Sequence, residues 1–538
     1  MIRINEIALS LDEDESQLKK KAAKILKINE KYIKKYTIYK KSIDARKKDD
    51  VHFTYSLDVN ISLDEEQIAS KCKSNKVQIV KPYVYELPEN KRVSKFRPVV
   101  VGFGPAGMFA GLILALSGLK PIILERGKDV EARKADVQKF WREKKLNEES
   151  NVQFGEGGAG TFSDGKLTTG IKSPFIKKIL EELYEAGAPE EILYSSKPHI
   201  GTDRLEIVVK NIRKKIESLG GEVRLECKLT RLIVANKFVH GVTYEHKGES
   251  IDLETDTVIM AIGHSARDTV EMLYNLGVDI MQKPFSVGAR IEHPQKLINE
   301  AQYGRFANHP KLGAADYKLS CHGLHERGAY TFCMCPGGTV VAAASEKECV
   351  IVNGMSSLAR DGENANSALL VGIEPKDFPS EHPLAGIYYQ REIEHKAYEL
   401  AGDHYFDMVR NSFEYIANNN TVQEELESDE PYKSDGTELY SYYSRSGQIR
   451  RLLLQGYTSI YMNDIQLYGY NGANHLLANN REIHEKTAQI SCELAEQAKG
   501  RCIYYNASEE GLMYMAKQIK DSLTMKPVGI LRASIKLS

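Results

Sequence analysis

A glycine-rich segment followed by an acidic residue carries the clearest chemistry in this sequence. The segment reads Gly102-x-Gly104-x-x-Gly107, it follows an apolar, β-branched run over 97–101, and Glu125 comes eighteen residues after its last glycine. A buried strand, a tight turn and a helix in this order predict a dinucleotide-binding unit. The first glycine allows the bend, the second lets the backbone approach a pyrophosphate, and the third lets the helix pack close to the strand.

The residues between this turn and the acid complete the same unit. Pro105 suits the first turn of a helix, Ala106 continues it, and Gly118 is placed to end it. The apolar run 121–124 predicts a second strand that delivers Glu125 at its carboxyl end. A carboxylate there accepts hydrogen bonds from ribose hydroxyls and repels a 2′-phosphate, so FAD or NAD is favoured over NADP.

A second glycine-rich segment has the same spacing in a different setting. Gly155, Gly157 and Gly160 form a literal G-x-G-x-x-G within 154–166, but no apolar strand precedes them and no helix is expected after them. This segment therefore does not predict a second dinucleotide unit. Glycines at this density let backbone N–H groups line an anion or a flat ring, and the alternative is a flexible surface loop.

The run 257–262 ends at Gly263 and predicts a strand that returns to the nucleotide sheet. With only one fingerprint in its proper context, a tightly held FAD is favoured over a dissociable NAD. A flavin exchanges a hydride at its N5 atom, so the expected chemistry is oxidation and reduction. The sequence predicts no separate domain for NAD(P)H, so NAD(P)H is expected only as an electron donor that binds transiently.

Cysteines and histidines give weaker indications. The eight cysteines show no C-x-x-C and no zinc spacing, which predicts no metal site and fits free thiols in a reducing cytoplasm. Cys333 and Cys335 would point to opposite faces of an extended strand, so packing is favoured over a redox role. His264 follows the return strand and is expected near the cofactor, but no histidine stands out as a catalytic base.

Composition bounds the class of protein. A chain of 538 residues is too long to fold around one hydrophobic core, so two or three domains are expected. The net charge of −1 gives no bias toward nucleic acid or membranes. No secretory signal and no long apolar run are visible, which predicts a cytoplasmic protein without a membrane segment. Residues 1–95 are mildly basic, with 21 Lys and Arg against 15 Asp and Glu. The simplest interpretation of this excess is a solvated, lysine-rich helix face.

The first 95 residues predict a small domain of their own. Strands are expected over 2–9, 36–45 and 51–61, and helices over 14–28 and 64–73. This β-α-β-β-α order predicts a ferredoxin-like α+β domain. The polar run 82–95 carries two prolines and is expected to be a linker.

Several motifs together resemble a known family. The stretch NVQFGEGGAGTFSDGKL at 151–167 is the most specific, and HIGTD at 199–203, AIGHSARD at 261–268 and FCMCPGG at 332–338 accompany it. In these motifs the chain resembles a largely uncharacterised family of bacterial FAD-dependent dehydrogenases, in which an N-terminal α+β domain precedes a glutathione-reductase-like FAD fold. The resemblance covers about residues 1–405. It implies that the following residues bind FAD: Gly102, Gly104, Pro105, Ala106, Gly107, Glu125, Arg126, Arg133, Gly157, Gly158, Ala159, Gly160, Thr161, Ser163, Asp164 and Gly263.

The predicted fold class is α/β. A doubly wound, Rossmann-like FAD-binding domain carries an inserted α+β substrate domain and follows the ferredoxin-like domain. The expected boundaries are 1–95 for the N-terminal domain, 96–200 for the first part of the FAD domain, 201–256 for its further strands and connection, 257–285 for its return segment, 286–405 for the substrate domain and 406–538 for a divergent C-terminal region that completes the FAD domain.

The C-terminal third departs from the family pattern. Proteins of this layout close the flavin site with a strand, a turn containing an acid and a helix. The nearest substitute is a strand over 459–462, then Asp464, Gly469 and Gly472, then a helix over 481–500. Asp464 is the candidate for the missing acid.

Three functions follow from these observations. The first is an FAD-dependent oxidoreductase, a dehydrogenase that transfers hydride to or from flavin N5 and acts on a small molecule. The second is a catalytically impaired FAD-binding or interaction protein, suggested by the altered C-terminus. The third is an FAD-dependent enzyme that modifies nucleic acid, which the overall charge does not favour. The sequence assigns no substrate, electron acceptor, catalytic residue or oligomeric state.

Overall fold

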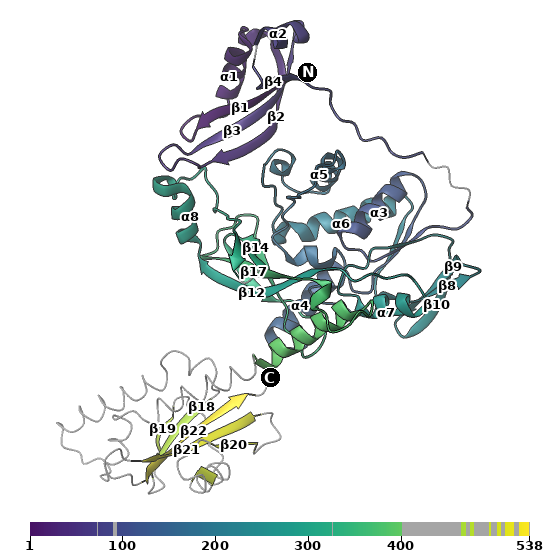
Figure 1. The fold of residues 1–538 in the computed structure, drawn as a ribbon, viewed down its shortest axis with the longest axis vertical. Coiled ribbons are helices and arrows are strands. Elements are labelled where there is room, and N and C mark those ends of the chain that lie inside the picture. Colours follow the sequence, from purple (N-terminus) through teal and green to yellow (C-terminus); the bar gives the residue numbers. More distant parts are fainter. Residues whose placement is uncertain are drawn as a thin grey trace, which may run out of the picture. The chain divides into compact units, whose positions relative to one another are not determined.

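The computed structural model describes residues 1–400 apart from 73, 90–93, 325 and 326, and in the C-terminal part it describes five strands and residues 494–495. The chain divides into two compact units, Met1–His395 and Lys396–Ser538. The first unit contains the N-terminal domain, the nucleotide domain and a third domain rich in antiparallel strands (Figure 1).

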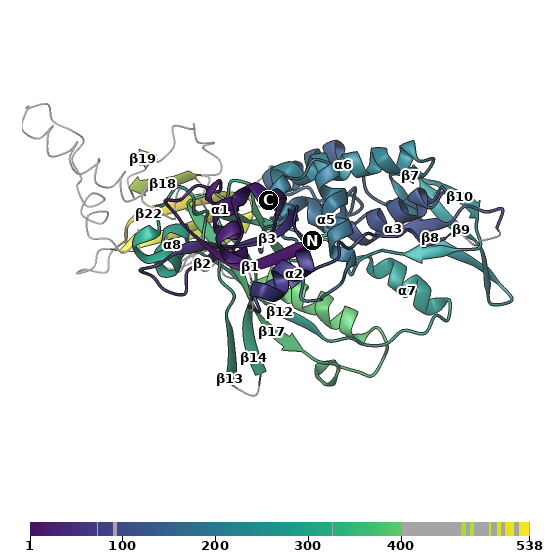
Figure 2. The same ribbon diagram turned by 90° about the horizontal axis from the view of Figure 1, so that it is seen from above.

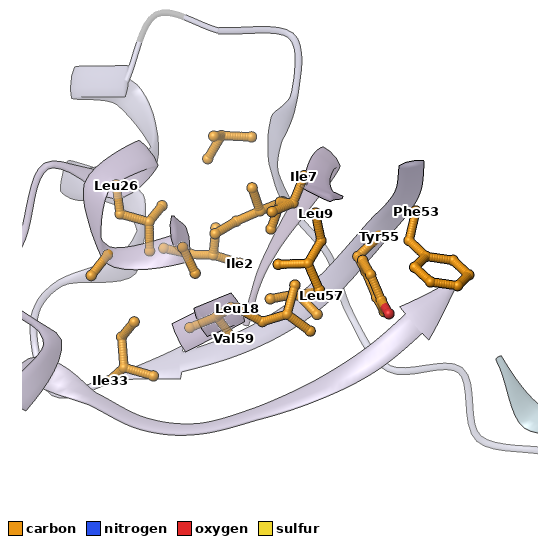
Figure 3. Close-up of a cluster of buried hydrophobic side chains, with 14 of the residues drawn as sticks. Ile2, Ile7, Leu9, Leu18, Leu26, Ile33, Phe53, Tyr55, Leu57 and Val59 are labelled. Atoms are coloured by element: carbon orange, nitrogen blue, oxygen red, sulfur yellow. The ribbon is translucent and has the colours of Figure 1, made fainter. Parts of the chain in front are cut away.

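The N-terminal domain has the predicted ferredoxin-like fold. Its sheet has the order β2-β3-β1-β4, and α1 and α2 lie on one side of it (Figure 1). Alternate residues of β1 and β3 point into the core, where Ile2, Leu9 and Leu57 pack with Leu18 of the first helix (Figure 3). In chain order the elements are β1 (Ile2–Ser10), α1 (Gln17–Leu26), β2 (Ile33–Asp44), β3 (His52–Ile61), α2 (Glu65–Cys72) and β4 (Val77–Ile79).

The nucleotide domain is built on a four-stranded parallel sheet of order β11-β5-β6-β7. The strand after the linker, β5, lies between β6 and β11. The chain continues from β5 to β6 on one side and later adds β11 on the other side, so the turn after β5 lies at the point where the strand order reverses. Ligands bind at this position in doubly wound folds. The strands are β5 (Val99–Val101), β6 (Ile122–Leu124), β7 (Glu222–Arg224) and β11 (Val258–Met260).

Different layers cover the two faces of this sheet. Val100 and Ile123 pack into the cluster formed with α3 (Pro105–Leu116) and α6 (Thr202–Ser218). Their neighbours in the strands, such as Val101, pack on the opposite side against a three-stranded antiparallel meander. Successive side chains of a strand point to opposite faces of the sheet, so alternate residues of these short apolar strands contact the helices and the meander. The meander consists of β8 (Cys227–Ala235), β9 (Phe238–His246) and β10 (Glu249–Glu254). The sequence predicts strands over 230–235 and 239–244 here, but it does not predict the polar β10.

The nucleotide domain has further helices, of which η2 lies within the glycine-rich loop. They are α4 (Val130–Glu143), the short 3₁₀ helix η2 (Gly158–Phe162), α5 (Phe175–Glu185), η3 (Glu190–Leu193) and α7 (Arg267–Asn275). The sequence predicts helices over 130–145, 174–186 and 203–219, and the structure confirms them as α4, α5 and α6.

The third domain contains an antiparallel sheet of order β12-β17-β14-β13 and a separate hairpin, β15-β16. Figure 2 shows β13 and β14 projecting as a hairpin. The elements are β12 (Phe285–Pro294), α8 (Gln295–Tyr303), η4 (Gly304–Phe306), β13 (Ser320–Leu324), β14 (Arg327–Cys335), β15 (Gly338–Ala342), β16 (Val352–Ser356), β17 (Asn364–Ile373) and η5 (Pro375–Asp377).

The strands described in the second unit form an antiparallel sheet of order β19-β18-β22-β21-β20. Asp464 and Gly469 are the two ends of β18 in this sheet. The strand predicted over 459–462, Gly472 and most of the helix predicted over 481–500 lie outside the described residues. Completion of the FAD domain by residues 406–538 stays a prediction. The strands are β18 (Asp464–Gly469), β19 (Asn474–Leu477), β20 (Ile503–Asn506), β21 (Leu512–Lys520) and β22 (Pro527–Lys536).

Candidate functional site

The predicted turn after β5 has the geometry that its glycines suggest. Gly102 adopts a φ of 96°, and a Cβ on it would collide with the carbonyl group of Ala261. A Cβ on Gly107 would collide with the carbonyl group of Gly102, so this glycine lets α3 pack on the turn. Gly104 is the N-cap of α3. The first and third glycines therefore have the predicted bend and packing roles.

A cavity of about 560 Å³ opens where this turn faces the glycine-rich loop. The N-terminus of α3 contributes Pro105 and Ala106 to its wall, and η2 contributes Gly158, Ala159 and Gly160. Backbone N–H groups at a helix N-terminus favour an anion, because they have no partner within the helix. The predicted residues that line the cavity are Gly102, Gly104, Pro105, Ala106, Glu125, Arg126, Gly158, Ala159, Gly160 and Gly263.

Glu125 joins the two glycine-rich segments. Its carboxylate accepts hydrogen bonds from the backbone N–H groups of Phe103, Gly127 and Gly155, at 2.7, 2.9 and 2.9 Å. The residue is buried but still lines the cavity. A carboxylate has about four acceptor positions, so about one remains for a hydroxyl group in the cavity.

Arg126 forms a charged wall beside Glu125. It donates two hydrogen bonds to Asp268, at 3.0 and 2.9 Å, and one to Glu149 at 2.7 Å. Lys228 also pairs with both carboxylates. Burial opposes ionisation of Asp268, but hydrogen bonds and charge from Arg126 and Lys228 outweigh it and hold the pKa of that carboxyl well below its usual range. The Arg126 guanidinium stacks 4.2 Å from the ring centre of Phe154, which lines the cavity.

Arg133 does not face the cavity, which corrects the prediction that it contacts the FAD phosphates. Its side chain is fully buried and donates hydrogen bonds of 2.7–3.0 Å to four backbone carbonyl groups. Those carbonyls belong to Asn151, Val152, Glu156 and Gly158. Burial lowers the pKa of Arg133 to about 10, so it stays charged at neutral pH. This arginine holds the glycine-rich loop in shape.

Four other loop residues that were predicted to bind the cofactor also lie outside the cavity wall. A Cβ on Gly157 would meet Thr161 and Val209, and the Thr161 hydroxyl donates to the Glu156 carbonyl group at 3.0 Å. Ser163 donates to the carbonyl group of Gly160 at 2.7 Å. Asp164 is fully buried between two cations, Arg360 and Lys166, at 2.5 and 2.7 Å. These residues fix the loop and attach it to the third domain.

Comparison with known proteins agrees with this geometry. An "Uncharacterized protein" of Clostridium beijerinckii is 49% identical over 406 residues, which is 75% of each chain. A family model described as "FAD-dependent protein, C-terminal domain-like" matches residues 284–455, and a domain of unknown function matches residues 1–60. The chain belongs to this bacterial family of FAD-dependent proteins.

Solved structures resemble this chain only weakly, with low sequence identities and low TM-scores. A flavin-dependent brominase is 12% identical with a TM-score of 0.29, and the match covers 52% of this chain and 57% of that one. A glycerol-3-phosphate dehydrogenase from Bacillus halodurans complexed with FAD is 11% identical with a TM-score of 0.27, over 53% of this chain and 48% of that one. The chain thus spans about half the length of these structures. Its FAD-binding, Rossmann-like fold rests on the sheet order and on the fingerprint.

The residues around the cavity fit the FAD of this family. The carboxylate of Glu125 suits a ribose and the N-terminus of α3 suits a pyrophosphate. The lack of side chains at Gly104 and Gly158 lets the turn and the glycine-rich loop approach each other beside the cavity. Sequence reasoning missed the opposite wall. Four of its residues lie within the motifs at 151–167 and 261–268 but were not singled out. The other four, Cys227, Lys228, Leu229 and Thr269, follow no recognisable motif, and only their positions after the strands β7 and β11 could have indicated them. The residues of this wall include Gln153, Phe154, Cys227, Lys228, Leu229, Ser265, Ala266 and Thr269.

His264 lies in the cavity wall, where it was expected. Burial and the positive charge of Arg267 lower the pKa of His264, so its ring is neutral at pH 7. Among the residues that the structure describes, no cluster of three or more His, Cys, Asp or Glu could hold a metal. No helix in the same part of the chain has the length and apolar character needed to cross a membrane.

Cys333 and Cys335 are not on opposite faces, which corrects the prediction from strand alternation. The pairing of β14 with β17 shifts between Phe332 and Cys335, and Cys333 adopts a left-handed backbone with a φ of 46°. This β-bulge breaks the period of two. The Cys335 thiol donates a hydrogen bond to the Cys333 carbonyl oxygen at 3.3 Å, and the two side chains are close enough to shift each other's pKa.

Proposed function

We propose that this chain is an FAD-dependent oxidoreductase, a dehydrogenase that exchanges a hydride with a small-molecule substrate and takes NAD(P)H as a transient electron donor. When bound, FAD would supply two-electron chemistry at flavin N5. The observation that carries the proposal is the convergence of the α3 N-terminus, the η2 glycines and Glu125 on one cavity. Each of these features suits a different part of the same dinucleotide.

The residues divide the binding work between them. The remaining acceptor position of Glu125 would take a ribose hydroxyl, and its negative charge disfavours a dinucleotide with a 2′-phosphate. Backbone N–H groups after Gly104 would hold the pyrophosphate. The neutral ring of His264 can accept a proton at the cavity wall.

A charge placed at the start of α3 tests the binding site. Ala106 is exposed toward the cavity, so Ala106→Glu adds an acidic side chain without disturbing the core. The variant helix gains about 0.3–1 kcal/mol from its dipole, while FAD affinity falls by at least about 100-fold because like charges repel. Visible absorbance and flavin content of the purified protein measure the effect.

A matched control carries the same charge elsewhere. Gln17 is an exposed first-turn residue of α1, and Gln17→Glu is expected to leave flavin content unchanged. If the wild-type protein folds but stays colourless with added FAD, the proposal fails. If Ala106→Glu retains flavin like the control, the cofactor does not bind at this helix. Anaerobic bleaching of the bound flavin by NADH or NADPH supports an oxidoreductase, whereas bound flavin that no reductant or substrate bleaches points to an FAD-binding protein without turnover.

A further inference from the structure

A second chemical site lies where the glycine-rich loop meets the third domain. Lys166 follows the loop, and its Nζ lies 3.7 Å from the Sγ atom of Cys335. Cys333 is partly exposed, while Cys335 is fully buried. A partly exposed thiol next to a buried second thiol and a cation is the arrangement typical of reactive cysteine pairs.

Arg290 and Asn366 complete the surroundings of the two thiols. Arg290 donates to the Cys333 carbonyl oxygen at 3.2 Å and to Oδ1 of Asn366. Asn366 is fully buried, pairs across the sheet with Cys335, and its Nδ2 has no hydrogen-bond partner within the described structure. An unpaired buried donor beside a thiol is costly unless a ligand satisfies it.

Gly354 packs closely against the centre of this cluster, which has no room for a side chain there. A Cβ on this residue would lie 2.8 Å from the Cys335 sulfur and closer still to Arg290 and Asn366. Three polar groups from three strands therefore converge on a position without a side chain. Lys166 and Arg290 make the surroundings of the two thiols positive, which favours a disulfide that bears negative charge.

The cluster also explains which thiol reacts first. The hydrogen bond from Cys335, aided by the charges of Lys166 and Arg290, lowers the pKa of Cys333 although burial opposes this. The hydrogen bond to Cys333 and burial raise the pKa of Cys335. By contrast, burial raises the pKa of Cys227 and Cys349, so neither of these thiols has the character of a nucleophile.

We propose that Cys333 and Cys335 form a dithiol site that reduces low-molecular-weight, anionic disulfides. The Cys333 thiolate attacks one sulfur of the disulfide, which forms a mixed disulfide and releases one thiolate that takes a proton from solvent. Cys335 then attacks Cys333, the Cys333–Cys335 bond forms, and the second thiol leaves with the Cys335 proton. Two electrons pass from the dithiol to the substrate, and the products are two thiols and one protein disulfide.

This proposal does not depend on the cofactor. The reaction is a single turnover of the reduced chain, so it proceeds whether or not FAD is bound. A folded protein that binds no added FAD but still performs the exchange would contradict the proposed function and leave this inference standing.

The test uses the full-length chain, reduced and desalted, with glutathione disulfide as the probe. After an acid quench, peptide mass spectrometry is expected to show a bond between Cys333 and Cys335 and the release of two glutathione thiols per chain. The rate should exceed adduct formation at the exposed Cys321 by about 10-fold or more. Cys335→Ser should stop at a glutathione adduct on Cys333, and Cys333→Ser should give neither product.

Cys321→Ser serves as the control and should behave like the wild type. The inference is overturned if both thiols of the wild-type chain stay free, if the adduct at Cys321 forms as fast as the change at Cys333, or if folded Cys335→Ser accumulates no adduct. The measurement on the wild-type chain can overturn the inference without any variant, so the test stays conclusive even if a variant fails to fold.

Discussion

Two segments of this chain share the spacing G-x-G-x-x-G and have unrelated structures. At 102–107 the glycines form a strand-turn-helix unit in which backbone packs on backbone. At 155–160 the chain has no preceding strand and is held by the buried side chains of Arg133 and Glu125. The same pattern thus forms a turn that its own backbone packing stabilises at 102–107. At 155–160 it forms a loop that side chains from other parts of the chain stabilise.

The largest effect should come from removing the side chain that holds the loop. Arg133→Met removes a hydrogen bond from each of four buried carbonyl groups, and we expect the free energy of unfolding to fall by about 3–5 kcal/mol. Urea denaturation measures this loss. Arg142→Ala, on the exposed side of the same helix, should change stability by no more than about 0.5 kcal/mol. Similar values for the two variants would show that the loop holds itself.

The third glycine of each segment gives a sharper comparison. Gly107→Ala forces a Cβ onto the Gly102 carbonyl group, and we expect a loss of about 1–3 kcal/mol. A Cβ on Gly160 would lie 3.6 Å from Pro105 Cγ, which is an ordinary contact, so Gly160→Ala should be nearly neutral for folding. Because Gly160 lines the cavity, that variant should instead lose FAD affinity. Thermal unfolding and flavin titration separate the two outcomes, and equal destabilisation would remove the distinction.

The smallest effect concerns the charged wall of the cavity. Asp268 is partly exposed, so Asp268→Asn should cost no more than about 1 kcal/mol at pH 7. The folded protein lowers the pKa of this carboxyl, so its contribution is present above the unfolded value of 3.8 and disappears as the pH falls through the folded value. The stability difference between wild type and variant should therefore be constant near neutral pH and shrink in acid. A difference that grows in acid would contradict this assignment.

The sequence predicts local structure well wherever neighbours in the chain determine it. The fingerprint, the order of the ferredoxin-like domain and the return strand all depend on short-range periodicity, and they agree with the structure. Arg133 was misassigned because its partners are carbonyl groups 18 to 25 residues away, which no side-chain pattern reveals.

Features that the local sequence pattern does not encode explain the other errors. The bulge at Cys333 exists only in relation to β17, so alternation within β14 could not predict it. Part of the far wall of the cavity, including Lys228 and Thr269, comes from segments more than one hundred residues after the fingerprint. The polar strand β10 follows a simple hairpin but carries no apolar run.

The three hydrogen bonds to Glu125 also bear on how the cofactor arrives. They tie the turn, the end of β6 and the glycine-rich loop together through protein groups alone. The conformational entropy of ordering this loop is therefore lost when the chain folds, and binding does not have to offset it. The cavity is preorganised, so cofactor release would leave a folded protein that can be loaded again.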